Sequence, residues 1–185
     1  MKIDFDSKKS KFFDEVKIIT PSVFKEERGS IWSSFIKKDI DTFLPNNLTF
    51  NHDKFSESKK NVLRGIHGDH KSWKLISCIS GKIFQVIVDL RKSSKSFLKS
   101  ESFILDAANK KMILIPPGMG NAFLVLSDTA TYHYKLAYKG NYIDAENQFT
   151  IAWNDPRLKI DWPITNPILS DRDKSLSYEN NKAQR

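Results

Sequence analysis

The sequence predicts an all-β protein, folded as an antiparallel jelly roll with a short N-terminal helix and an irregular C-terminal segment. Three observations predict this class. Apolar residues fall in short runs that alternate with polar ones, turn residues separate the runs, and no stretch keeps a helical period over several turns. Many short strands at close spacing are typical of jelly rolls. We expect one domain over residues 1–174, followed by a polar tail at 175–185.

The predicted strands are short runs rich in Val, Ile, Leu and Phe. Within the run 82–90, Phe84, Val86 and Val88 point to one face and Gln85 and Asp89 point to the other, which is the period of a β-strand. The other runs are similar in length and composition. In chain order the predicted strands are residues 16–19, 31–35, 62–66, 73–79, 82–90, 101–105, 111–115, 122–126 and 131–137.

Turn-forming residues bound these strands. Gly81 and Gly118 mark tight turns, because glycine accepts backbone angles that other residues avoid. Residues 36–44 predict one short helix. Beyond residue 155 the chain is interrupted repeatedly by proline, which predicts irregular structure there; these prolines are Pro156, Pro163 and Pro167.

Composition narrows the class of function. The net charge of +8 reflects 30 Lys and Arg residues spread along the chain, and no nucleic-acid-binding motif is present. We therefore expect a pocket for an anionic small molecule and no nucleic-acid partner. No apolar run approaches the roughly 18 residues that cross a bilayer, no signal-peptide pattern begins the chain, and Cys78 has no disulfide partner. These features predict a cytoplasmic protein without membrane contact.

The most informative stretch is Arg64-Gly65-Ile66-His67, followed by Lys74 and, further on, by Tyr134. Proton abstraction beside a carbonyl needs a neutral base, a cation that holds the developing enolate, and an acid that returns the proton. Histidine, lysine and tyrosine can fill these roles. Carbon-acid chemistry is therefore the predicted reaction type.

A metal centre is the competing interpretation of the same residues. Jelly rolls of the cupin type often bind metal through two histidines two residues apart, a carboxylate, and a further histidine after a Pro-Gly turn. Here His67 and His70 are three residues apart, Lys74 stands near the carboxylate position, and Asn121 occupies the last one. Because three or four ligands cannot be assembled, we expect no metal and no other cofactor.

These motifs, taken together, resemble the dTDP-4-dehydrorhamnose 3,5-epimerase family. The resemblance implies a cupin-like jelly-roll homodimer that epimerises a 4-keto nucleotide sugar at C3, C5 or both, in bacterial capsule or lipopolysaccharide biosynthesis. It runs from about residue 16 to residue 173, and the segments that carry it are 24–29, 62–67, 74–76, 81–91, 115–127, 134–135, 153–155 and 162–173.

The resemblance also implies a role for individual residues. His67 corresponds to the base, Asp173 to its carboxylate partner, Lys74 to the enolate-stabilising cation and Tyr134 to the acid. Contacts to the substrate are expected from a second set, which comprises Arg28, Arg64, Asn51, Asp53, Asn121 and Arg172.

Two of these assignments have rivals nearby. Tyr132 and Tyr134 share a strand face, so the strand period alone allows either tyrosine to be the acid. Asp171 competes with Asp173 for the position beside the histidine. His70 and His133 receive no role.

Departures from the family pattern concern the nucleotide. The loop 68–73 is short, Asn121 replaces a histidine, and Ser30 and Ser33 stand where the family has an aromatic residue and a glutamate. A carboxylate such as Asp69 can accept hydrogen bonds from a guanine edge. We therefore expect a weak preference for a GDP-linked heptose over a dTDP-linked deoxyhexose.

Two other classes of function remain open at this stage. A nucleotide-sugar 3,4-ketoisomerase carries a second histidine close to the first, and His70 keeps that option. A non-catalytic cupin that binds a nucleotide sugar is the other, although a binder needs no paired acid and base.

Overall fold

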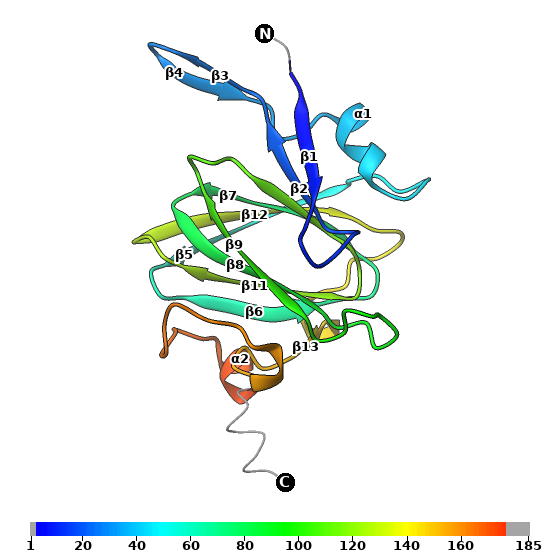
Figure 1. The fold of residues 1–185 in the computed structure, drawn as a ribbon, viewed down its shortest axis with the longest axis vertical. Coiled ribbons are helices and arrows are strands. Elements are labelled where there is room, and N and C mark those ends of the chain that lie inside the picture. The colour runs from blue at the N-terminus through cyan, green and yellow to red at the C-terminus, as the bar shows by residue number, and fades with distance from the viewer. Residues whose placement is uncertain (1–2, 177–185) are drawn as a thin grey trace.

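The computed structural model describes residues 3–176, and within them the chain folds into two facing antiparallel sheets and a separate hairpin (Figure 1). The first sheet has the order β1 (Phe5–Lys9), β2 (Lys17–Pro21), β10 (Met112–Ile115), β7 (Trp73–Ser80), β12 (Thr129–Ala137) and β5 (His52–Lys59). The second has the order β13 (Phe149–Thr150), β6 (Leu63–Gly68), β11 (Met119–Val125), β8 (Lys82–Asp89) and β9 (Ser100–Asp106). The predicted all-β jelly-roll class is confirmed.

Short helices lie outside the sheets. Residues 36–44 form α1 (Lys37–Ile40) and the 3₁₀ turn η1 (Asp41–Phe43), as the sequence predicts. The C-terminal segment is mostly irregular, with the 3₁₀ turns η2 (Ala145–Asn147) and η3 (Pro156–Leu158) and a short helix α2 (Asp171–Ser175) that was not predicted. Of the expected tail at 175–185, Ser175 ends α2, and residues 177–185 lie outside the described part of the chain. No helix within residues 3–176 is long and apolar enough to cross a bilayer.

Buried apolar residues form three clusters, one between the sheets and one on the outer face of each. The inner cluster joins side chains of both sheets, such as Ile76, Ile87 and Phe123. The outer face of the first sheet is covered by the region of α1, and that of the second by the C-terminal segment, through Leu158 and Trp162. Strands with both faces covered carry apolar residues on both, which explains why their runs look continuous.

The predicted alternation in β8 is correct in its period, but the polar face is not solvent-exposed. Gln85 and Asp89 are fully buried, and so are Val86 and Val88 on the other face. The C-terminal segment covers Val86 and Val88, whereas Gln85 points inward and makes hydrogen bonds there. Buried polar groups of this kind must find partners, and these do.

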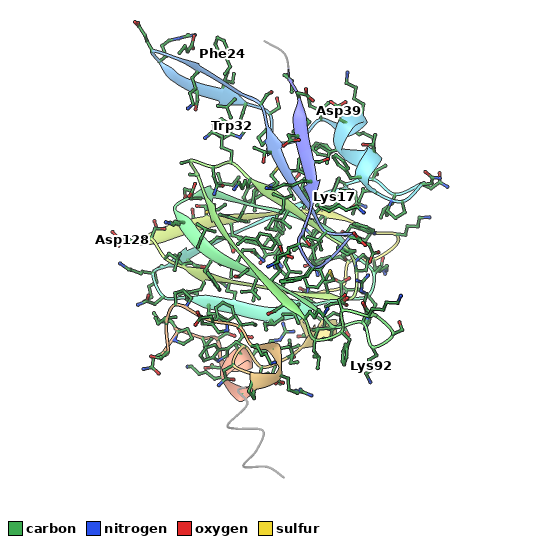
Figure 2. All side chains as sticks on the ribbon, in the orientation of Figure 1. Lys17, Phe24, Trp32, Asp39, Lys92 and Asp128 are labelled. Atoms are coloured by element: carbon green, nitrogen blue, oxygen red, sulfur yellow. The ribbon has the colours of Figure 1, made fainter. Side chains whose placement is uncertain are left out.

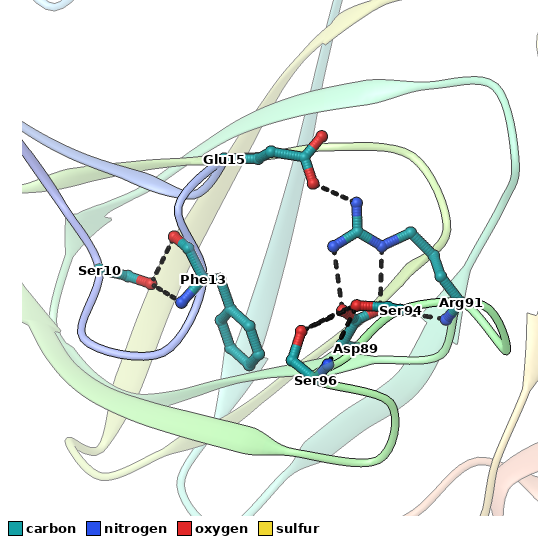
Figure 3. A network of polar contacts seen from close by, with 7 residues as sticks. All are labelled: Ser10, Phe13, Glu15, Asp89, Arg91, Ser94 and Ser96. Carbon is teal, nitrogen blue, oxygen red and sulfur yellow. Dashed lines mark hydrogen bonds and ion pairs between the residues drawn. The ribbon is translucent and has the colours of Figure 1, made fainter.

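Asp89 anchors a network at the end of β8 (Figure 3). It accepts hydrogen bonds from Arg91 Nε and Nη2, both at 2.9 Å, and from the hydroxyls of Ser94 and Ser96, both at 2.6 Å. Arg91 also pairs with Glu15. Burial opposes ionisation of Asp89, but the Arg91 guanidinium and the two hydroxyls outweigh it and lower the pKa of the carboxyl to about 2.

The hairpin of β3 (Val23–Glu26) and β4 (Gly29–Trp32) projects from the body, at the opposite end of the long axis from α2 (Figure 1). Its large apolar side chains are exposed: Phe24 by 46%, Ile31 by 56% and Trp32 by 40% (Figure 2). A protruding apolar arm of this kind is unusual for a surface that faces only water.

Candidate active site

A cavity of about 540 Å³ lies among β5, β6, β7, β11 and β12 and is bounded by the C-terminal segment. It brings together most of the residues that the sequence predicted. Those lining it are Arg64, His67, Lys74, Asn121, Tyr134, Arg172 and Asp173. Segments more than 100 residues apart meet here, since His67 and Asp173 are separated by 106 positions.

His67 is held by Asp173. The imidazole Nε2 and Asp173 Oδ1 are 2.6 Å apart, and the Asp173 side chain is only 4% exposed. Ser170 caps α2 by accepting the Asp173 backbone N–H, and its hydroxyl donates to Asp173 Oδ2 at 2.9 Å. The carboxylate is therefore fixed before it meets the ring. With the proton of the neutral imidazole on Nε2, Nδ1 carries the lone pair.

Asp171, the rival of Asp173, is exposed and contacts Lys174 at 3.3 Å. Its position at the start of α2 directs it away from the histidine, which Asp173 already binds. The structure thus places Asp173, and not Asp171, beside His67.

Lys74 enters the cavity from β7 and is paired with a carboxylate behind it. Its Nζ lies 3.0 Å from Asp69 Oδ2, and both side chains are buried, with exposures of 8% and 1%. Burial opposes ionisation of Asp69, but the Lys74 ammonium and the backbone N–H groups of Ser72 and Lys71 hold the pKa of that carboxyl below its ordinary value. Asp69 is thus engaged inside the protein, and the suggested guanine contact is wrong for this carboxylate.

Tyr134, not Tyr132, lines the cavity. Tyr132 is fully buried, stacks on Phe123 with ring centroids 4.2 Å apart, and donates its hydroxyl to Gln85 Oε1 at 2.9 Å. Burial raises the pKa of Tyr134, and the nearby Arg64 guanidinium offsets part of that rise. Tyr134 therefore stays protonated near neutral pH.

Asn121 is oriented by the same inner network. Its Oδ1 accepts a hydrogen bond from Gln85 Nε2 at 2.7 Å, and the Tyr132 hydroxyl lies 3.2 Å from the same oxygen. Because donors occupy the oxygen, the amide nitrogen is the group that remains for a ligand. A neutral donor therefore stands at the cavity wall, opposite His67 in the β6–β11 register.

Further cations make the cavity suited to an anion. Arg64 is held by Ser58 Oγ at 3.0 Å, and Arg172 donates to the carbonyl of Gln148 at 3.4 Å. Lys54, which the sequence reasoning missed, donates to the Tyr142 hydroxyl at 3.3 Å. Fixed cations around a concave site are typical of phosphate recognition.

Comparison with known proteins identifies the family. A sequence model described as dTDP-4-dehydrorhamnose 3,5-epimerase matches residues 11–180. This chain belongs to that family. The dTDP-4-dehydrorhamnose 3,5-epimerase of Escherichia coli K12 is 41% identical over 167 residues, which cover 88% of this chain and 89% of the relative.

Solved structures agree with the sequence match. A dTDP-6-deoxy-D-glucose-3,5-epimerase of Legionella pneumophila, in complex with dTDP-4-keto-L-rhamnose, has a TM-score of 0.86 and 36% identity and covers 94% of this chain and 92% of its own. A Bacillus anthracis dTDP-4-dehydrorhamnose 3,5-epimerase with TDP and PPi bound has a TM-score of 0.85 and 33% identity, with coverages of 94% and 98%. The chain is thus a nucleotide-sugar epimerase, an enzyme of the isomerase class.

Three residues expected to bind substrate in this epimerase do not line the cavity. Asp53 pairs with His133 at 2.6 Å and with Lys135 at 2.8 Å on the outer face of the first sheet. Burial opposes ionisation of Asp53, but Lys135 and His133 lower its pKa. Asn51 donates to the carbonyl of Tyr138 in an exposed position. Neither side chain lines the cavity of its own chain, and a substrate contact from either residue stays a prediction.

The reason lies in the strand period of β5. Successive residues alternate between the two faces, so Lys54 and Ser56 point inward when Asp53 points outward. The residues of β5 that line the cavity are therefore the even-numbered ones, Lys54 and Ser56, rather than Asp53. Arg28, the third, lies in the β3–β4 hairpin and pairs with Glu26 there.

No group of three His, Cys, Asp or Glu side chains that could hold a metal gathers within residues 3–176. His67 is bound to Asp173, while His70 packs on the ring of Phe149 at 4.8 Å and does not line the cavity. The two histidines that suggested a metal site therefore point to different surroundings. A metal-free reaction stays a prediction.

Proposed function

We propose that this epimerase inverts C3, or C3 and C5, of a nucleotide-diphospho-4-keto sugar by removing the proton next to the ketone and returning one to the opposite face. The observation that carries the proposal is the convergence of His67 with Asp173, Lys74 and Tyr134 on one cavity. A base, a cation and an acid are the three parts that this reaction needs.

His67 removes the proton. Its Nδ1 lone pair takes the hydrogen α to the carbonyl, while Asp173 keeps the other ring proton on Nε2 and stabilises the imidazolium that forms. The carboxylate thus selects the tautomer that leaves a base facing the sugar.

Lys74 and Tyr134 complete the cycle. The Lys74 ammonium holds the enolate oxygen, and a fixed cation in a partly dry site is worth more than one in water. Tyr134 then gives its proton to the carbon from the other face, which inverts the stereocentre. Its raised pKa keeps it protonated until the enolate forms.

The substrate that we propose is a dTDP-linked 4-keto-6-deoxyhexose. The cations Lys54, Arg64 and Arg172 supply charge for the diphosphate. The weak sequence preference for a GDP-linked heptose depended partly on Asp69, which is occupied by Lys74. Curated relatives that share 35–41% identity are named for dTDP-4-dehydrorhamnose. Its product would enter bacterial capsule or lipopolysaccharide synthesis, which starts in the cytoplasm.

We also propose that the enzyme works as a homodimer. The β3–β4 hairpin exposes Phe24, Ile31 and Trp32 and carries Arg28 away from the cavity of its own chain. Burial of this arm against a second copy removes apolar surface from water and allows Arg28 to approach the partner's nucleotide. Sedimentation of the purified protein tests it: a monomer at micromolar concentration rules the dimer out.

Two competing functions lose support. The ketoisomerase alternative depended on a second histidine beside His67, but His70 packs against Phe149 outside the cavity. The non-catalytic alternative leaves the buried Lys74–Asp69 pair and the His67–Asp173 pair without a purpose, although burying such groups costs free energy.

Solvent exchange tests the reaction. In D₂O the enzyme should place deuterium at C3, or at C3 and C5, of dTDP-4-keto-6-deoxyglucose, and a new epimer should appear by NMR. The absence of both signals rules out the epimerase function on this substrate. A thermal-shift panel of dTDP, GDP, UDP and CDP tests the base, because a bound ligand stabilises the fold in proportion to ln(1 + [L]/Kd). The largest shift with GDP would restore the heptose hypothesis.

A further inference from the structure

We infer that Asp69 is a positioning residue for catalysis: it aims the Lys74 ammonium at the reacting carbonyl and keeps it protonated. The inference rests on the proposed function, because it assigns Lys74 the enolate. It adds Asp69, a residue of the loop between β6 and β7, to the groups that act at the cavity.

The two oxygens of Asp69 have separate partners. Oδ1 accepts the backbone N–H groups of Lys71 at 2.9 Å and Ser72 at 2.6 Å, so the loop itself fixes the carboxylate. Oδ2 faces Lys74 at 3.0 Å. The orientation of the carboxylate is therefore set by the backbone, and Lys74 adjusts to it.

The same loop links this carboxylate to the base. His67 lies in β6, and Asp69 follows it by two residues, just past the end of that strand at Gly68. The Asp69 carbonyl accepts the backbone N–H of Gly118 at 2.7 Å, which ties the loop to the turn before β11. The base and the counter-ion of the cation are thus carried by one short segment. Their spacing is fixed by backbone geometry rather than by flexible side chains.

Burial makes the pairing necessary. Lys74 is 8% exposed, and an isolated ammonium at such a depth tends to lose its proton or to move toward water. Asp69 supplies the opposite charge that such a buried group needs, 3.0 Å from Lys74 Nζ. It engages one side of the ammonium, which carries three N–H donors, so donors remain for the substrate oxygen. The carboxylate partly neutralises the charge of Lys74. In return it holds the ammonium in one orientation, toward the substrate carbonyl.

Asp69→Asn tests this role, because the amide oxygen can still accept the two loop N–H groups while the charge beside Lys74 is lost. We expect kcat to fall by about 10–100-fold, less than the roughly 10²–10³-fold that loss of a direct oxyanion donor costs, because Lys74 itself remains. KM should change little. The alkaline limb of the pH–rate profile should move to lower pH, since the ammonium is no longer favoured. The matched control is Asp128→Asn (Figure 2), which removes the carboxylate of an exposed pair with Lys60 at 3.8 Å and should leave kcat and the profile unchanged.

A wild-type kcat and profile in Asp69→Asn would overturn the inference. A lower melting temperature with an unchanged pH–rate profile would also overturn it, because Asp69 would then contribute to stability and not to catalysis. If Asp69→Asn does not fold, Asp69→Glu decides: the charge is retained, so the alkaline limb should stay at its wild-type pH even if kcat drops. A shifted limb in Asp69→Glu would contradict the role.

A chemical readout separates this inference from the reaction itself. Only a neutral amine reacts with an acetylating reagent, so Lys74 in the wild-type protein should react slowly at pH 8, and Asp69→Asn should accelerate its modification about tenfold, measured by peptide mass spectrometry. Acceleration without any epimerase activity in the wild type would uphold the pairing and reject the proposed substrate. Equal rates in both proteins would reject the pairing even in an active enzyme.

Discussion

Two buried aspartates of this protein, Asp89 and Asp69, each pair with a cationic side chain. The two cations differ in how many hydrogen-bond donors remain for a ligand. Arg91 uses Nε and Nη2 on Asp89 and Nη1 on Glu15, so all three of its nitrogens contact carboxylates of the chain (Figure 3). Lys74 meets Asp69 on one side and the cavity on the other. The Asp89–Arg91 pair therefore stabilises the end of β8, whereas the Asp69–Lys74 pair leaves an ammonium at the cavity. The two pairs differ in that Lys74 lines a cavity, where its remaining N–H groups can donate to a ligand.

The comparison extends to the histidines. His67 with Asp173 and His133 with Asp53 have the same 2.6 Å contact between ring nitrogen and carboxylate. His67 lines the cavity, whereas His133 is on the outer face, stacked on Phe55 with centroids 4.6 Å apart. The distance alone therefore does not distinguish the proposed base from the histidine outside the cavity.

The largest expected effect separates these two histidines. His67→Asn should lower deuterium incorporation at C3 and C5 on the order of 10²–10⁴-fold, because the general base is lost. His133→Asn removes an equally close pair outside the cavity and should retain the wild-type exchange rate. Nucleotide binding, followed by thermal shift, should be unchanged in both. Exchange above a tenth of the wild-type rate in His67→Asn would mean that another group is the base.

The second effect separates proton removal from proton return. Tyr134→Phe should lower the rate of product formation about 10²-fold while exchange of the substrate proton falls by less than tenfold, because the base is intact and the acid is missing. Proton NMR in D₂O measures both rates in one sample. Tyr138→Phe, which removes a hydroxyl that contacts His52 away from the cavity, is the control. Equal losses of exchange and product would argue against Tyr134 as the acid.

A smaller effect falls on stability rather than on rate. The pKa of Asp89 is about 2 against an ordinary 3.8, so its contribution is fully present above the unfolded value and is lost as the pH falls through the folded one. Asp89→Asn should cost roughly 2 kcal/mol of unfolding free energy at pH 6. The difference from wild type should shrink as the pH falls through about 2, where half of the folded-state carboxyl is protonated, and should vanish only below it. Urea unfolding at several pH values measures it.

The control for Asp89 is Asp14→Asn, which acts on an exposed pair with Lys9 at 3.1 Å and should change stability by less than about 0.5 kcal/mol. Turnover at pH 7 should be unchanged in both variants. A tenfold loss of kcat in Asp89→Asn would show that the network is coupled to the site.

The smallest expected effect is none at all. Dialysis against EDTA should leave the exchange rate at its starting value, since Lys74 supplies the positive charge that a metal would otherwise provide. If activity disappears on dialysis and returns when a divalent ion is added, the metal ion and not Lys74 holds the enolate.

Sequence reasoning reached most of the fold because strand periodicity is local. It missed β1, β3, β5 and β13. The strand β5 was missed because polar residues on both of its faces leave no apolar alternation. Because β5 was missed, the sequence analysis selected Asn51 and Asp53, whereas Lys54 and Ser56 are the residues of this segment that line the cavity.

The site residues follow a similar rule. His67 and Lys74 are recognisable because they share one motif, but no local pattern connects His67 with Asp173, 106 positions away. Only the family resemblance proposed that pair. The choice between Tyr132 and Tyr134 needed the packing, because both point inward and only one reaches the cavity. The pairing of Asp69 with Lys74 could not be predicted from the sequence either, because it depends on how the short loop folds.

The docking of the C-terminal segment has a consequence for how the enzyme fails. The segment is held to the second sheet by Trp162 against Phe84, with ring centroids 5.5 Å apart, and by hydrogen bonds of Ile168 with Asn61 and Leu63. It then presents Asp173 to His67. A local opening of this segment would separate the two residues while both sheets stay folded. Inactivation by heat can therefore precede global melting, and a substrate that contacts Arg172 would hold the segment closed and so protect its own site.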